Sequence, residues 1–173
     1  MSSMKKYELT KETKVIGGKT LFRIRALRSF GDIKAGDLGG FIENERNLSH
    51  EGNAWVSGNA RVSGNALVSG NAWVRGDAWV SGYARVSGNA LVSGDGLINS
   101  NNDYLCEQGL GSHNRSASFF KCKDGHIHVL CGCFSGNLDE FENKVKQEHG
   151  NSKYAKEYLG FIEVVKTHFE VRQ

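Results

Sequence analysis

The sequence predicts a mainly β protein built around a solenoid of short, stacked strands. A six-residue repeat runs without a gap from Gly52 to Asn99, and each unit holds one aliphatic residue, one small residue and, in most units, a Gly-Asn pair. Residues two apart in a strand share a face, so the small and aliphatic side chains of a unit point to the same side. Glycine and asparagine tolerate positive φ, which suits the pairs between units to corners. Alternating strands and corners predict coils that stack on one another.

The repeat identifies the residues expected inside the coils. The aliphatic position is occupied in turn by Val56, Val62, Val68, Val74, Val80, Val86, Val92 and Ile98. The small residues two places earlier are Ala54, Ala60, Ala66, Ala72, Ala78, Ala84, Ala90 and Gly96. Two less regular units, at Ile42 and Leu48, come before them and are separated from them by a two-residue insertion at His50-Glu51. Irregular end units are typical of solenoid caps, so we expect the solenoid to span residues 42–99.

Residues 1–41 are expected to form an N-terminal β-hairpin cap. Apolar and polar residues alternate in Tyr7–Leu9 and Thr20–Leu27, and Gly17-Gly18 lies between the two stretches. This pattern is typical of a hairpin. Such a hairpin would cover the open end of the solenoid, where unpaired strand edges invite aggregation.

Residues 103–173 are expected to form a small C-terminal α+β module of ββαα order, after a linker at 99–103. Two strand-like stretches, 116–122 and 126–133, are joined by Lys123-Asp124-Gly125, which is a hairpin signal. Asn137, with Glu140 three residues later, predicts a capped helix start, and Gly150 predicts the helix end. A second helix is expected from Ser152 to about residue 169.

The repeats resemble the left-handed parallel β-helix of hexapeptide-repeat proteins, in which an inward aliphatic residue is followed four positions later by a small one, as in Val56 and Ala60. The resemblance implies three units per triangular coil, with 18 residues between equivalent positions. Residues 26–56 are similar to the lead-in of a bacterial and phage hexapeptide-repeat group. Residues 111–158 are similar to a module of unknown function at the ends of phage and prophage proteins. Together these likenesses imply a phage or prophage origin and bring no known activity.

Composition and charge narrow the partners and the location. The 173 residues carry 22 Lys and Arg against 19 Asp and Glu, a formal net charge of +3, so there is no strong nucleic-acid signal. No apolar run approaches the ~18–20 residues of a membrane span, so no membrane partner is expected. No apolar signal-peptide core follows the first residues. We therefore expect a cytoplasmic protein of a bacterial host cell, with its four cysteines reduced.

The solenoid offers little for catalysis. Enzymes of the resembling family use histidines on the coils, either as the base for acyl transfer from CoA or to hold a metal. The repeats from Gly52 to Asn99 contain no His, Cys, Glu or Lys, and general acid–base chemistry needs a group tuned near neutral pH. We therefore expect no enzyme, no catalytic residue and no cofactor. The alternative is an acyltransferase-like enzyme that uses CoA, for which His50 is the nearest base; otherwise His50 is a surface-loop residue.

A cluster of metal-ligating residue types occurs in the C-terminal module. It comprises Cys122, His126, His128, Cys131 and Cys133, with Cys106 upstream. Zinc binds such residues, but the two last cysteines are one residue closer than the usual C-x₂-C spacing, and buried cysteine also packs as a small apolar group. We expect packing roles and no metal; a zinc site and a redox pair are the alternatives.

The position before each inward aliphatic residue should point outward and carries several tryptophans. With three units per coil, Trp55, Trp73 and Leu91 stack on one face, and Trp79 lies on the next. A bare stripe of this kind is too apolar for solvent, and tryptophan is enriched at interfaces. We expect these four residues to form the interface of a homo-oligomer, most simply a trimer. The alternative is that the C-terminal helices of the same chain cover the stripe.

A glycine-rich turn is the candidate ligand site. Its backbone N–H groups and its cation could hold a phosphate or carboxylate; an ordinary loop is the alternative. The candidate ligand-binding residues are Gly111, Ser112, His113, Asn114, Arg115, Lys153 and Tyr154. The function expected is a non-enzymatic phage or prophage accessory protein. It would be an oligomeric scaffold that binds a host target, either a defence-system component or a small nucleotide signal, through its C-terminal module.

Overall fold

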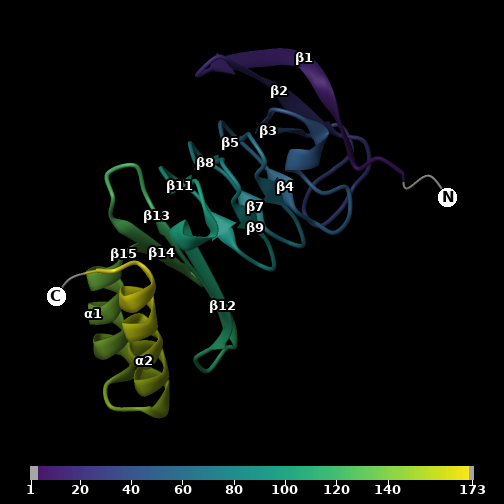
Figure 1. The fold of residues 1–173 in the computed structure, drawn as a ribbon. Helices are drawn as coiled ribbons and strands as arrows, with labels where there is room; N and C mark the ends of the chain where they lie inside the picture. Colours follow the sequence, from purple (N-terminus) through teal and green to yellow (C-terminus); the bar gives the residue numbers. More distant parts are fainter. Residues whose placement is uncertain (1–3, 172–173) are drawn as a thin grey trace.

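The computed structural model describes residues 4–171 and arranges them as three successive parts (Figure 1). A β-hairpin lies at one end, a β-solenoid in the middle, and a four-stranded sheet with two helices at the other end (Figure 1). In the part of the chain that the structure describes, neither helix is long and apolar enough to cross a membrane.

The N-terminal hairpin is confirmed. Strands β1 (Tyr7–Ile16) and β2 (Lys19–Ala26) pair antiparallel around Gly17 and Gly18, both of which have positive φ. Strand β3 (Leu38–Ile42) pairs antiparallel with β2 and parallel with the solenoid strand β5 (Arg61–Val62). The hairpin therefore extends one sheet of the solenoid beyond its first coil, and the strand order of this sheet is β1-β2-β3-β5-β8-β11.

Each solenoid strand is two residues long. The strands are β4 (Trp55–Val56), β5 (Arg61–Val62), β6 (Leu67–Val68), β7 (Trp73–Val74), β8 (Trp79–Val80), β9 (Arg85–Val86), β10 (Leu91–Val92) and β11 (Leu97–Ile98). They pair in parallel with the strand 18 residues on, as Trp55 does with Trp73 and Trp73 with Leu91. The expected stacking is therefore confirmed, with three six-residue units to a coil.

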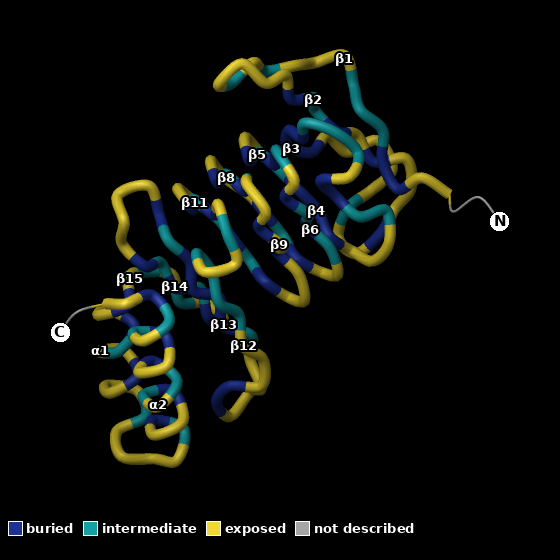
Figure 2. Tube along the Cα trace, viewed as in Figure 1, coloured by how far each residue is buried: buried dark blue, intermediate teal, exposed yellow. Residues whose placement is uncertain are grey.

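The interior of the coils is apolar, as the repeat predicts. The inward valines, alanines and Ile98 are at most 1% exposed, and Figure 2 shows this buried line inside the solenoid. Leu48 lies beside Val68 and Ile42 pairs with Val62, 20 residues apart instead of 18. The insertion at His50-Glu51 accounts for the two additional residues, and a short 3₁₀ helix, η1 (Glu45–Asn47), precedes it.

The corner glycines have positive φ, and those covered closely by the next coil also lack space for a Cβ. Gly70 has φ +66°, and a Cβ there would come within 3.1 Å of the Gly88 nitrogen on the next coil. The asparagines that follow the glycines do not adopt positive φ. Instead they stack along the corners, as where the Asn71 amide donates to Asn89 at 3.2 Å. The corners thus need glycine at one position and only a polar side chain at the other.

Side-chain donors close the N-terminal end of the solenoid. The Lys6 ammonium, fully buried, donates to the carbonyl of Ala54 at 2.8 Å. The Asn47 amide donates to the carbonyl of Ala66 at 2.8 Å, and the Tyr7 hydroxyl donates to that of Leu48, also at 2.8 Å. Among the described residues, these carbonyls receive no backbone N–H from a neighbouring coil, and a buried unpaired carbonyl is costly. The end cap is therefore made by three polar side chains beside the hairpin.

The C-terminal module has four strands where the sequence predicts two. Strands β12 (Tyr104–Leu110), β13 (Arg115–Lys121), β14 (Ile127–Cys131) and β15 (Phe134–Asn137) form an antiparallel sheet in chain order. Helices α1 (Leu138–His149) and α2 (Lys153–His168) follow, with the expected capping box at Asn137 and positive φ at Gly150. A 3₁₀ turn, η2 (Asn101–Asp103), lies in the linker.

The two faces of this sheet have different neighbours. Phe119 and Val129 pack with both helices, whereas Phe120 and Cys122 belong to the solenoid core. The Ser118 hydroxyl accepts a hydrogen bond from the Leu91 amide of the last coil at 2.9 Å. The sheet therefore closes the second open end of the solenoid, and the helices lie on its far side (Figure 1). The alternative in which these helices cover the tryptophan stripe is wrong.

Candidate functional site

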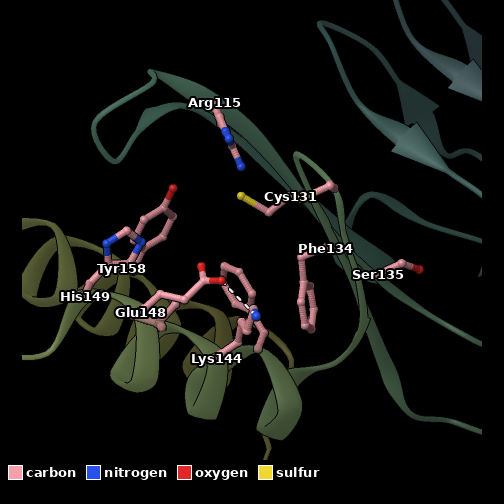
Figure 3. Close-up of a pocket in the computed structure, with 11 residues that line it drawn as sticks. Arg115, Cys131, Phe134, Ser135, Lys144, Glu148, His149 and Tyr158 are labelled. Atoms are coloured by element: carbon pink, nitrogen blue, oxygen red, sulfur yellow. Dashed lines mark ion pairs between the residues drawn. The ribbon is translucent and has the colours of Figure 1, made fainter.

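A cavity of about 340 Å³ lies between the C-terminal sheet and helix α1. Figure 3 shows the side chains around it, which come from β13, β14, β15, α1 and α2. Its lining consists of Arg115, Cys131, Cys133, Phe134, Ser135, Phe141, Lys144, Val145, Glu148, His149 and Tyr158. Phe134, Phe141 and Val145 give it an apolar floor, and polar side chains make its walls; the Ser135 hydroxyl points away from the cavity and contacts His128 (Figure 3). We call it the Arg115 pocket.

Arg115 supplies the positive charge of the pocket. It is the first residue of β13, where the β12–β13 hairpin closes, and its side chain points into the cavity (Figure 3). A Cβ at Gly132 would clash with the guanidinium, so glycine at this position leaves room for it. Among residues 4–171, no carboxylate lies within 4.0 Å of the guanidinium. Its five donors are thus available to an anion entering the pocket.

Tyr158 and Cys131 form the inner polar wall. Burial, followed by the nearby Cys131, raises the pKa of Tyr158 to about 12. Burial also raises the pKa of Cys131, against the opposing effects of Tyr158 and Arg115. Both groups are therefore protonated at neutral pH. His149 stacks on the Tyr158 ring with centroids 5.6 Å apart, which holds the phenol in place.

The outer wall is an ion pair on α1. Lys144 and Glu148 lie one turn apart and contact each other at 2.8 Å (Figure 3). The hydrogen bond between them lowers the pKa of Glu148 and raises that of Lys144. Both stay charged near neutral pH. The pair can open toward a ligand, because exposed ion pairs of this kind are weak.

Two titratable groups of the pocket, Cys131 and Glu148, do not have the pKa shifts of catalytic residues. A nucleophilic cysteine needs a depressed pKa, and a general base needs one near neutrality. Burial raises the pKa of Cys131, and the hydrogen bond from Lys144 lowers the pKa of Glu148 further from neutrality. What the pocket offers is an unpaired guanidinium above an aromatic floor, which suits a small organic anion with a planar or apolar part.

The structure divides the ligand site that the sequence groups together. Gly111, Ser112, Asn114, Lys153 and Tyr154 line a separate, open cavity of about 700 Å³. Arg115 instead lines the pocket named after it. The Gly111 amide donates to Glu157 at 3.1 Å, so a carboxylate of the chain itself uses the donor expected to hold an anion.

His113 lines neither cavity; its ring contacts the Ser112 hydroxyl at 2.9 Å. The sequence reasoning also missed Lys144, Glu148, His149 and Tyr158. Their spacing on two helices signals only amphipathic elements, and the face that meets Arg115 is set by tertiary packing.

Burial of Trp55 corrects its assignment to an interface between copies. Trp55 is only 1% exposed, because Phe30 and Tyr7 of the N-terminal segment cover it edge-on at 5.3 and 6.3 Å. Trp73 and Leu91 remain partly exposed. Trp79 is also partly exposed, with its indole N–H donating to Ser63 at 3.1 Å. The apolar stripe open to solvent is therefore shorter than the sequence suggests.

His50 lies in the loop before β4, where it is half-buried and packs into the N-terminal cap. Its ring stacks on Tyr7 at 4.3 Å, and its Nδ1 accepts a hydrogen bond from the Lys6 amide at 3.1 Å. Burial lowers the pKa of His50. Through these contacts His50 helps to hold Lys6 and Tyr7 in place at the first end of the solenoid.

The repeat region matches a known family model. The model described as the YdcK Beta solenoid repeat matches residues 54–70, 60–76 and 84–98. No curated protein matches the chain. The matched residues fall on the stacked two-residue strands and their corners. Repeats, strand register and family model agree that this chain is a β-solenoid repeat protein.

Proposed function

We propose that this protein is a non-enzymatic binding protein of a phage or prophage that captures a small anionic ligand in the Arg115 pocket. The solenoid, proposed to be a left-handed β-helix of the hexapeptide-repeat type, serves as a rigid body that carries the C-terminal module. The proposed place of action is the cytoplasm of a bacterial host. The observation that carries the proposal is the unpaired Arg115 guanidinium beside an aromatic floor.

The ligand class that fits best is a phosphate-bearing nucleotide. A guanidinium pairs two phosphate oxygens at once, which gives both charge and orientation. Phe134 is half-buried and offers an aromatic surface to a base, and the buried Phe141 ring packs against it with centroids 5.1 Å apart. A volume of about 340 Å³ lies within the range of small-molecule sites, at its lower end. A small nucleotide signal is therefore favoured over a protein target.

Oligomerisation is a separate part of the proposal. Trp73, Trp79 and Leu91 remain partly exposed on adjacent faces of the solenoid. Copies of the chain that pack through these residues would form a trimer, each presenting one C-terminal module. With Trp55 covered by its own chain, the proposed interface rests on three residues per copy.

Calorimetry separates binding from catalysis. We expect the wild-type protein to bind a member of a panel of mono-, di- and cyclic nucleotides with one site per chain and without consuming it. Acetyl-CoA serves as the test of the enzyme alternative. Turnover of acetyl-CoA that is lost in His50→Ala would overturn the proposal, as would the absence of heat with every nucleotide in the panel.

A further inference from the structure

A second group of chemically active side chains lies outside the pocket, at the tip of the β13–β14 hairpin. The Cys122 thiol and one ring nitrogen each of His126 and His128 all lie within 4.8 Å of one another. The tight turn between the strands brings them together. The Cys122 amide donates to the His126 carbonyl at 2.9 Å, and the Gly125 amide donates to the Cys122 carbonyl at 2.9 Å.

We propose that Cys122, His126 and His128 bind one divalent transition-metal ion, for which zinc is the best fit. One thiolate and two imidazoles are ligands that zinc prefers, and three protein ligands leave a fourth position for water. Zn–S and Zn–N bonds of about 2.3 and 2.0–2.1 Å place ligand atoms roughly 3.3–3.8 Å apart. The three side chains must therefore close by about 1 Å. His126 is exposed, so no close packing opposes a movement of that size.

Both histidines already have the outer partners that orient metal ligands. His126 Nδ1 lies 2.5 Å from a carboxylate oxygen of Asp124, which leaves Nε2 for the metal. His128 Nε2 lies 2.9 Å from the Ser135 hydroxyl, which leaves Nδ1. A carboxylate or hydroxyl on the second ring nitrogen is the usual outer shell of a zinc-bound histidine. The contacts from Asp124 and Ser135 distinguish this cluster from one in which cysteine and histidine are merely close together.

Strand alternation divides the five residues that the sequence groups together. Cys122 packs into the solenoid core, whereas Cys131 faces the helices and Cys133 is exposed. The metal set is therefore Cys122 with the two histidines, and the two later cysteines take no part. On this point the proposal departs from the expectation that all these residues serve only packing.

The site lies at the seam between the solenoid and the C-terminal module. Cys122 forms a β-bridge with Gly96 of the last coil, and Lys123 pairs with Asp95 at 3.3 Å. On binding, the Cys122 thiol releases its proton to solvent and its sulfur bonds to the metal. The bound ion would then hold the hairpin tip against the last corner of the solenoid.

Cobalt titration of tag-free, metal-stripped protein tests the site. We expect one equivalent of Co²⁺ to give the sulfur-to-cobalt charge-transfer band and tetrahedral d–d bands, and zinc to displace it. Cys122→Ser and His126→Gln should each weaken binding at least about 100-fold. Asp124→Asn should weaken it by about 10–100-fold, the usual effect of an outer-shell change. Cys133→Ser is the matched control and should bind as the wild type does.

His126→Gln also guards against a folding artefact, because that side chain is exposed and its loss leaves the core intact. Zinc should raise the melting temperature of the wild-type protein and leave that of His126→Gln unchanged. Cobalt spectra without a thiolate band, or equal affinity in wild type and His126→Gln, would overturn the proposal.

Discussion

Lys6 illustrates how one residue meets two opposing demands. Its ammonium caps carbonyls at the base of the solenoid, with distances of 2.8 Å to Ala54 and 3.4 Å to Gly52. Burial, and then the charge of Arg28, lowers the pKa of Lys6 to about 8. The hydrogen bonds stabilise the fold, while the buried charge costs free energy that is relieved when the amine loses its proton.

This balance predicts a pH dependence of stability. Between pH 8 and 10 the unfolded chain keeps the Lys6 proton and the folded chain loses it, so the Lys6 contribution to stability rises with pH. Buried thiols such as Cys122, whose pKa is raised to about 11, act in the opposite direction. The measurement is therefore the difference in unfolding free energy between wild type and Lys6→Met at each pH.

We expect that difference to shift in favour of the wild type by about 2 kcal/mol from pH 7 to 10. Urea denaturation at matched pH values measures it. A difference that stays flat over this range would contradict the assigned role of Lys6.

At the scale of the element, the six-residue period explains why the solenoid is so predictable. Each unit repeats the same local rule, so strands β4–β11 and their register follow from the sequence alone. Strands β12 and β15 do not follow. Glu107, Gln108 and Gly109 interrupt the apolar pattern of β12, and β15 is four residues long with a glycine. Their strand conformation comes from pairing with β13 and β14, which is a tertiary effect.

The same distinction applies to the candidate site. Arg115 is identifiable in sequence as a cation beside a glycine-rich turn. The residues of α1 and α2 that line the pocket with it cannot be identified in this way. Helical periodicity predicts which face of a helix is buried, but it does not predict how that face is oriented against the sheet. The hydrogen bond from the Gly111 amide to the Glu157 carboxylate could not be predicted for the same reason.

Two corner glycines give a matched test of coil stacking. Gly70 and Gly88 share nearly the same φ, +66° and +67°, but only Gly70 has another coil above it. Gly88→Ala should cost about 1–2 kcal/mol from left-handed backbone strain. Gly70→Ala should cost more, because its Cβ also meets the Gly88 nitrogen at 3.1 Å. Thermal unfolding of both variants measures the difference; equal destabilisation would contradict the stacking register.

At the scale of the whole molecule, both ends of the solenoid are closed by different means. Lys6, Tyr7 and Asn47 close the first end with side-chain donors. The C-terminal sheet closes the second end by adding Phe120 and Cys122 to the solenoid core. The C-terminal module is thus a structural cap as well as the proposed binding module. Removing it would expose the core, so point variants test its function better than truncation does.

The oligomer proposal belongs to this scale. Trp73→Glu places a charge in the proposed interface, where burial of one tryptophan contributes about 1.5–3 kcal/mol. We expect this variant to be monomeric and the wild type trimeric in analytical ultracentrifugation at micromolar concentration. Val15→Glu, on the exposed hairpin, is the control and should leave the assembly unchanged. A monomeric wild-type protein would remove this part of the proposal.

The location of the bound ligand tests the central claim most directly. For the nucleotide that binds best, calorimetry compares wild type with Arg115→Ala, Lys153→Ala and Arg75→Ala. Arg115→Ala should weaken binding by about 10- to 150-fold, which corresponds to a hydrogen bond to a charged group. Lys153 lines the other cavity and Arg75 is an exposed corner residue of the solenoid, so both of these variants should bind as the wild type does. Unchanged affinity in Arg115→Ala, or an equal loss in Lys153→Ala, would contradict the assignment of ligand binding to the Arg115 pocket.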